Sequence, residues 1–133
     1  MIGDVARSLE NEPNYRVRRG QMPTLETVHL LGATGEPALA GTWVVAGGSW
    51  LAPGFYKDPF GIVHLFGNVK SGTIASTVFT LPTGYRPSAD IVFATATGAW
   101  AYGTVKITSA GVVSVESGTN THVSFEGITF RAL

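Results

Sequence analysis

The chain of 133 residues has no cysteine, no net charge and few charged side chains of either sign. Without cysteine, disulfide bonds, thiolate nucleophiles and cysteine-ligated zinc are all excluded. A formal net charge of zero gives no basic surface for nucleic acid and no polybasic run for an anionic membrane. No apolar run approaches the length of a transmembrane span. We therefore expect neither nucleic-acid binding nor membrane insertion.

The charged fraction is 14%, whereas soluble domains usually reach about a quarter. Something other than a solvated, charged surface must cover part of such a chain. Interface cores between subunits are depleted of charge, so a subunit interface is the simplest explanation. The low charge therefore predicts that the protein is an oligomer.

Motifs for catalysis are also missing. The sequence contains no Gly-x-Ser-x-Gly nucleophile elbow, and the spacing of its carboxylates does not suggest the converging pair that a glycosidase needs. The histidines are too far apart to match a metal-ligand motif: His29, His64 and His122. We expect that the protein is not an enzyme and that it binds neither a metal ion nor a cofactor.

The pattern of residues divides the chain near residue 41. Charge is concentrated in the first twenty residues, and residues 20–40 contain several glycines and prolines around one short apolar run. Residues 1–41 are interpreted as an N-terminal arm that is ordered against a partner or another subunit. Residues 42–133 form the second region, which we expect to be the folded domain.

In the second region apolar residues alternate with a period of two, and glycine-rich turns separate the runs. No helical stripe is long enough to cover a sheet, so the sheets must pack on each other. The predicted fold is an all-β antiparallel sandwich, and we expect its strand order to be that of a jelly roll. The predicted strands are Thr42–Ala46, Phe55–Lys57, Ile62–Lys70, Thr77–Leu81, Asp90–Thr97, Tyr102–Thr108, Val112–Glu116 and His122–Arg131.

Two of these strands have unusual patterns. The strand from Ile62 is apolar on both faces, which indicates that one face meets the core and the other a neighbouring subunit. Ile62, His64 and Phe66 are therefore the candidate interface residues of a homotrimer. In the last strand the apolar parity reverses at Gly127, which predicts a bulge or bend near Glu126 and Gly127.

Aromatic residues are the remaining candidates for a binding site. Trp100 and Tyr102 follow a predicted turn, where they could stack on a sugar ring or anchor a protein contact. The alternative interpretation is that both residues cap the sandwich edge or pack between subunits. Trp43 and Trp50 flank a Gly-Gly turn, and we expect them to lock the junction between arm and domain.

The second region resembles the C-terminal receptor-binding head domain of bacteriophage tail-fibre and tail-tip proteins. The resemblance covers about residues 50–133, and its most specific element is Leu-Pro-x-Gly-Tyr-Arg-Pro at residues 81–87. Pro82 ends a strand, Gly84 permits a turn and Pro87 restricts the residue before it to extended geometry. The matching stretches are Phe55–Val69, Gly72–Thr73, Phe79–Pro87, Val105–Ile107, Gly111–Val113 and Val123–Arg131.

The resemblance implies a jelly-roll head, assembled as a homotrimer, that ends a fibre and attaches to a host-surface saccharide or protein. The N-terminus lacks the order of a signal peptide, which agrees with a virion protein made in the host cytoplasm. Tail fibres carry long shafts that this sequence lacks, so a structural or decoration protein of the virion is the alternative. In either case Arg16, Arg18 and Arg19 are candidates for attachment to other virion proteins.

Overall fold

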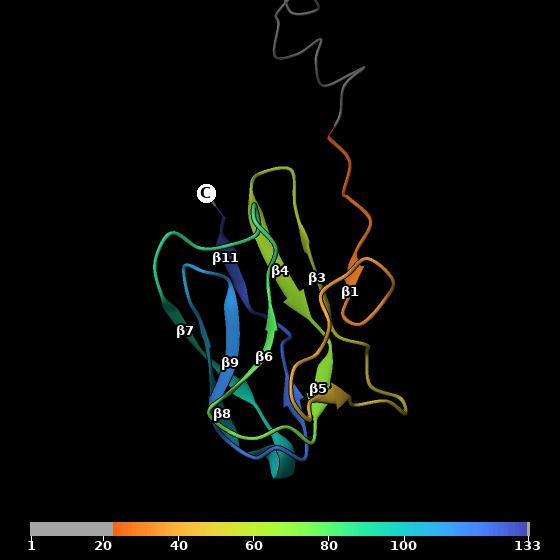
Figure 1. The fold of residues 1–133 in the computed structure, drawn as a ribbon, viewed down its shortest axis with the longest axis vertical. Helices are drawn as coiled ribbons and strands as arrows, with labels where there is room; N and C mark the ends of the chain where they lie inside the picture. Colours follow the sequence, from red (N-terminus) through yellow and green to blue (C-terminus); the bar gives the residue numbers. More distant parts are fainter. Residues whose placement is uncertain (1–22, 133) are drawn as a thin grey trace, which may run out of the picture.

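The computed structural model describes residues 23–132, and these residues form an all-β fold (Figure 1). Within the described residues every strand pairing is antiparallel, and the one short helical segment is a 3-10 turn, η1 (Gly98–Trp100). The strands are β1 (His29–Leu30), β2 (Val44–Val45), β3 (Gly54–Lys57), β4 (Ile62–Phe66), β5 (Asn68–Lys70), β6 (Ser76–Thr80), β7 (Ile91–Ala96), β8 (Tyr102–Ile107), β9 (Val112–Ser117), β10 (Val123–Ser124) and β11 (Thr129–Arg131).

These strands form three antiparallel sheets, with the orders β1-β3-β4-β11, β10-β5-β2 and β6-β9-β8-β7. The first two sheets are joined at Gly67, the single residue between β4 of the first sheet and β5 of the second. Gly67 has φ +85°, and a Cβ at this position would lie 2.2 Å from the carbonyl oxygen of Ala52. The long strand predicted from Ile62 is therefore broken by a bend that only glycine allows.

The bend predicted near Glu126 and Gly127 is confirmed. Strand β10 ends at Ser124 and β11 starts at Thr129, with Gly127 between them at φ +84°. The bend allows apolar side chains of both parities to point inward. The buried residues on its two sides are Val123, Phe125, Ile128 and Phe130.

One hydrophobic core lies between the sheets and takes side chains from all of them. Phe55 of β3 and Phe79 of β6 are both buried, and their rings stack with centroids 6.1 Å apart. In β9, Val113 and Val115 point inward as the alternation predicts. Contacts across a shared core define the arrangement as that of a β-sandwich.

Ser114 of β9 differs from its sequence prediction. Its position in the alternation predicts an outward, solvated side chain, but it is buried and hydrogen-bonded 2.7 Å from Glu116 Oε2. Glu116 itself is exposed, as predicted. A carboxylate two residues along the strand lies on the same face, which explains how the serine hydroxyl is satisfied without water.

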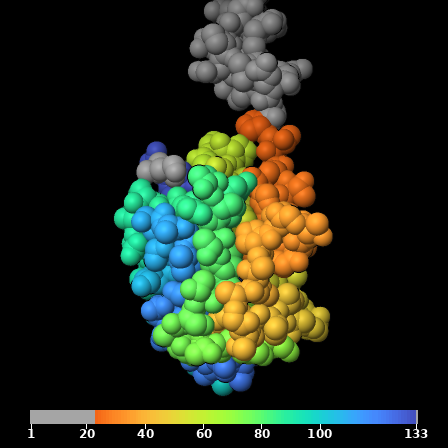
Figure 2. All heavy atoms as spheres, in the orientation of Figure 1, coloured from red at the N-terminus to blue at the C-terminus, as the bar shows by residue number. Residues whose placement is uncertain are grey.

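The described part of the segment expected to be an arm packs on the domain of its own chain. Strand β1 pairs with β3, Leu31 is buried in the core, and the Ala40 N–H donates to the Val78 carbonyl at 2.7 Å. Figure 2 shows this segment, in orange, along one flank of the molecule. The three arginines proposed for attachment, Arg16, Arg18 and Arg19, lie outside the described residues.

Trp43 locks the start of the domain, in agreement with the sequence interpretation. Its ring is buried against Gly72, where a Cβ would lie 1.8 Å from Trp43 Cδ2. Its indole N–H donates to Ser76 Oγ at 3.0 Å. Within residues 23–132, no helix has the length and apolar character needed to cross a membrane.

Candidate functional site

The predicted interface residues lie together on the outer face of the β1-β3-β4-β11 sheet. Ile62, His64 and Phe66 alternate with buried Val63 and Leu65, and all three are partly exposed. The His64 ring stacks on Tyr56, with centroids 4.7 Å apart and planes 7° from parallel. One face of β4 is therefore buried in the core and the other is partly exposed, while the predicted subunit interface on the exposed face stays a prediction.

Asp58 fixes His64 on this face. The Asp58 Oδ2 atom lies 2.9 Å from His64 Nε2, while Oδ1 accepts the backbone N–H groups of Phe60 and Ile62. The hydrogen bond with His64 is the main cause that lowers the pKa of Asp58 below its ordinary value. His64 is thus held by the turn between β3 and β4, and its position has a structural explanation.

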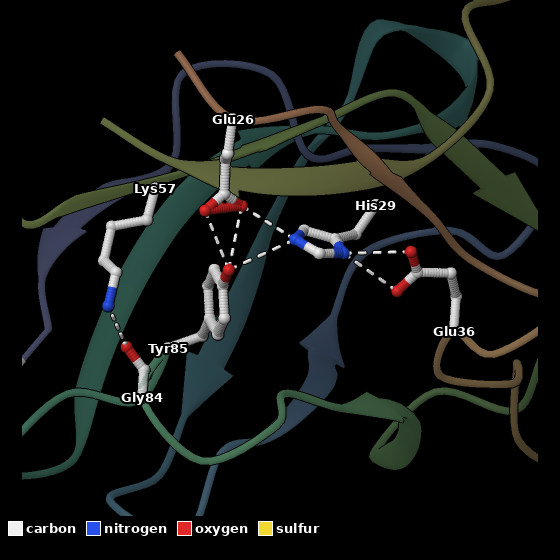
Figure 3. A network of polar contacts seen from close by, with 6 residues as sticks. All are labelled: Glu26, His29, Glu36, Lys57, Gly84 and Tyr85. Carbon is white, nitrogen blue, oxygen red and sulfur yellow. Dashed lines mark hydrogen bonds and ion pairs between the residues drawn. The ribbon is translucent and has the colours of Figure 1, made fainter. Parts of the chain in front are cut away.

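A second polar cluster joins the start of the described chain to the sandwich (Figure 3). His29 of β1 lies between two carboxylates, with Nε2 2.7 Å from Glu26 Oε2 and Nδ1 2.9 Å from Glu36 Oε2. The Tyr85 hydroxyl donates to Glu26 at 2.8 Å, and Lys57 donates to the Gly84 carbonyl at 2.8 Å. The cluster therefore connects three segments that are distant in sequence.

The charges of this cluster are mutually stabilised. Burial acts to lower the pKa of His29, but hydrogen bonds to Glu36 and Glu26 outweigh it and raise that pKa. Burial acts to raise the pKa of Glu26, but hydrogen bonds from Tyr85 and His29 hold it below its ordinary value. A general acid needs a carboxyl group with a raised pKa, which is the opposite of Glu26. We interpret the cluster as an electrostatic latch.

A pocket of about 490 Å³ lies at the opposite end of the sandwich, where η1 meets the β10-β5-β2 sheet. The isolated bridge between Thr97 and Val123 joins the two layers at this point. Aromatic and apolar groups line most of the pocket, with polar side chains between them. The lining residues are Trp50, Leu51, Asn68, Ala96, Thr97, Gly98, Ala99, Trp100, Thr121, His122, Ser124 and Glu126.

A tightly hydrogen-bonded turn forms one wall of this pocket. The Thr97 N–H donates to the Ala101 carbonyl at 2.7 Å, and the Ala101 N–H donates back to Gly98 at 3.2 Å. The Gly98 N–H donates to the His122 carbonyl at 2.8 Å, and the Thr119 hydroxyl donates to the Gly98 carbonyl at 3.1 Å. These bonds fix the turn against the loop between β9 and β10.

The turn holds Trp100 in an unusual conformation. Ala99 and Trp100 have φ values of +58° and +59°, a region that costs non-glycine residues about 1–3 kcal/mol each. The Trp100 side chain is 89% exposed, so packing of the ring does not repay this strain. Strained, exposed aromatics of this kind occur where a site is preorganised for a ligand.

Trp50 also lines the pocket. Its ring contacts His122 with centroids 4.2 Å apart, and half of the side chain is exposed. The backbone N–H of Trp50 donates to the Gly47 carbonyl at 3.1 Å, and this bond closes the Gly-Gly turn that precedes Trp50. The sequence interpretation, in which Trp50 locks a junction, did not include this placement. Trp50 and Trp100 are far apart in the sequence, so the sequence did not indicate that both line the same pocket.

The two aromatic residues predicted for ligand binding occupy different places. Trp100 lines the pocket, whereas Tyr102 begins β8 outside the lining and is 87% exposed. His122, treated in the sequence as an ordinary strand residue, also lines the pocket. Among residues 23–132, no group of three histidine or acidic side chains is arranged to hold a metal ion.

Comparison with protein-family models, with curated proteins and with solved structures found no match to this chain. The resemblance to phage receptor-binding heads therefore stays a prediction from the sequence. The pocket and the outer sheet face are the features on which a functional proposal has to rest.

Proposed function

We propose that this chain is a virion protein of a bacteriophage, the receptor-binding head of a tail fibre or tail tip. Its aromatic pocket attaches to a host-surface saccharide. The single observation that supports this proposal best is the pocket itself, in which Trp50 and Trp100 are exposed to an entering ligand. A jelly-roll strand order and a homotrimeric assembly belong to the same proposal.

The chemistry of the pocket suits a sugar. The apolar faces of a pyranose ring stack on tryptophan, while hydroxyl groups need donors and acceptors at the ring edge. The pocket offers both kinds of group, because Asn68, Thr121 and Ser124 line it together with the two tryptophans. A volume of about 490 Å³ accommodates a short oligosaccharide segment.

The position of the pocket supports an attachment role. In Figure 1 the described chain begins at the top of the molecule, and η1 lies at the bottom. A head that is joined to a particle at one end and binds a receptor at the other requires this separation. In this proposal, neighbouring heads of a trimer meet at the outer face with Ile62, His64 and Phe66, which is partly exposed.

Binding to host cells and to an oligosaccharide panel tests the proposal. Trp50→Ala and Trp100→Ala should each weaken binding by tenfold or more, because truncating a tryptophan hot spot costs about 2 kcal/mol or more. Phe60→Ala is the matched control, since Phe60 is 85% exposed in the turn between β3 and β4, away from the pocket. That variant should bind like the native chain.

The same binding experiments distinguish the receptor-binding proposal from the alternative, a decoration protein without a receptor role. A native chain that is incorporated into particles but binds neither host cells nor any oligosaccharide would support decoration and overturn the receptor proposal. Unchanged binding in both tryptophan variants would instead show that the pocket is not the site of attachment.

A further inference from the structure

Glu126 gives the aromatic pocket a distinctive charge. In the described part of the chain, it is the one carboxylate that lines the pocket, and no lysine or arginine is among the lining residues. The remaining lining side chains are apolar or uncharged polar groups, together with the imidazole of His122. A pocket of this composition repels an anionic ligand and attracts a cationic one.

The backbone holds the Glu126 carboxylate in place. Its Oε1 accepts the Gly67 N–H at 3.1 Å, at the bend between β4 and β5. The Glu126 N–H in turn donates to Ser124 Oγ at 3.2 Å. Within residues 23–132, Oε2 has no hydrogen-bond partner. The carboxylate is thus anchored through one oxygen, and the other remains available to a ligand.

The tryptophans add to the same preference. Ammonium groups are attracted to the face of an indole ring, more strongly than to other aromatic side chains. Two tryptophans and one anchored carboxylate therefore favour a ligand that has both an apolar ring face and a positive charge. An amino sugar with an unacetylated amine combines these two properties.

We infer that the pocket selects saccharides that carry a protonated amino group, and that Glu126 is the residue that recognises the amine. This inference rests on the proposed saccharide-binding function and names the substrate class of that site. Neutral sugars stack in the pocket without the charge contact, and acidic sugars meet the Glu126 carboxylate as a repulsive group.

Three tetrasaccharides with the same β-1,4 backbone provide the test, since they differ at C2 alone: an amine, an acetamide or a hydroxyl group. We expect titration calorimetry at mildly acidic pH to show about tenfold tighter binding of the amine form. Glu126→Gln should remove this preference while neutral binding persists. Glu116→Gln is the matched control, because Glu116 is an exposed carboxylate that does not line the pocket.

The results distinguish the two proposals. Equal or tighter binding of the acetamide or hydroxyl form by the native chain overturns the amine preference and leaves saccharide binding intact. A preference that survives in Glu126→Gln overturns the role of Glu126. If none of the three sugars binds, the amine preference fails, and the proposed function fails with it when host cells are not bound either.

Discussion

Trp100 is presented by a turn that depends on Gly98. A Cβ on Gly98 would lie 1.9 Å from Thr121 Oγ1 and 2.7 Å from Thr119 Oγ1. Gly98→Ala should therefore push the turn away from the loop between β9 and β10 and cost about 1–3 kcal/mol of unfolding free energy. Urea unfolding of the variant measures the loss, and sugar binding should fall as it does for Trp100→Ala.

A second substitution tests the cause of this effect. Thr121→Ala removes the nearest oxygen, so the double variant Gly98→Ala, Thr121→Ala should recover most of the lost stability. If the two substitutions destabilise additively, the clash with Thr121 is not the reason, and the turn depends on Gly98 in another way.

The sequence predicted some of these residues for a physical reason and could not predict others. Trp100 follows a glycine turn and is separated from any apolar alternation, which indicates an exposed aromatic. Trp50 shows the same local signal, but its partner His122 is 72 positions away (122 minus 50). Their contact depends on how β5 and β10 pair, and local patterns do not contain that information.

At the scale of elements, the two bends of the sandwich depend on glycine to different degrees. Gly67 and Gly127 have nearly the same φ, +85° and +84°. A Cβ at Gly67 would meet the Ala52 backbone, whereas a Cβ at Gly127 would have no atom within 4 Å. Gly127→Ala should cost about 1 kcal/mol for conformational strain alone. Gly67→Ala should cost clearly more, because the clash adds to that strain.

Thermal unfolding of both variants gives the comparison directly, since each serves as the control for the other. Equal losses would show that the Ala52 contact relaxes at little cost. We further expect Gly67→Ala to weaken amine recognition, because the Gly67 N–H positions Glu126.

The strands themselves were largely predictable. Period-two alternation located β6, β7, β8 and β9 to within one or two residues, because each has one face in the core. Strand β1 was missed, since its two residues lie among glycines and prolines and their pairing with β3 is a tertiary contact. The break at Gly67 was also missed, because the apolar pattern continues on both sides of it.

The latch around His29 should make the docking of β1 depend on pH. The raised pKa of His29 means that its contribution is complete below 6.5 and is lost as pH rises through the folded value. The lowered pKa of Glu26 means that its contribution is complete above 4.5 and is lost at lower pH. Docking should therefore be strongest between pH 4.5 and 6.5.

Hydrogen exchange measures this dependence at the N–H groups of Leu31 and Gly32, which bond to the carbonyls of Pro53 and Pro37. We expect exchange, corrected for its intrinsic rate, to become faster at alkaline pH. The corresponding free energy of local opening should fall by about 1 kcal/mol or less, because the side chains are partly exposed. His29→Gln should remove the alkaline change. Tyr85, with a pKa of about 12, does not titrate in this range.

At the scale of the whole molecule, the proposed function assigns attachment to the end of the sandwich with the latch and binding to the end with the pocket. The alternation along the chain predicted a β-sandwich, because alternating strands without helices can only bury their faces against each other. The relation between the two ends arises from strand order, which brings the turn before β8 beside β10. Residue patterns cannot provide such an order, and it became visible only in the structure (Figure 1).

The outer face of the β1-β3-β4-β11 sheet leads to the last prediction, the oligomeric state. Tyr56, Ile62, His64 and Phe66 form a continuous, partly exposed strip there. Light scattering after size exclusion should give three times the 14.0 kDa of one chain. Ile62→Lys should lower this mass, because it places an unpaired charge in the interface.

Val92→Lys is the matched control, because Val92 is 63% exposed on a different sheet. Its mass should equal that of the native chain. A monomeric native chain would contradict the trimer. An intact trimer in Ile62→Lys would mean that the subunits meet elsewhere, and the low charge of the chain would then have to be explained by another surface.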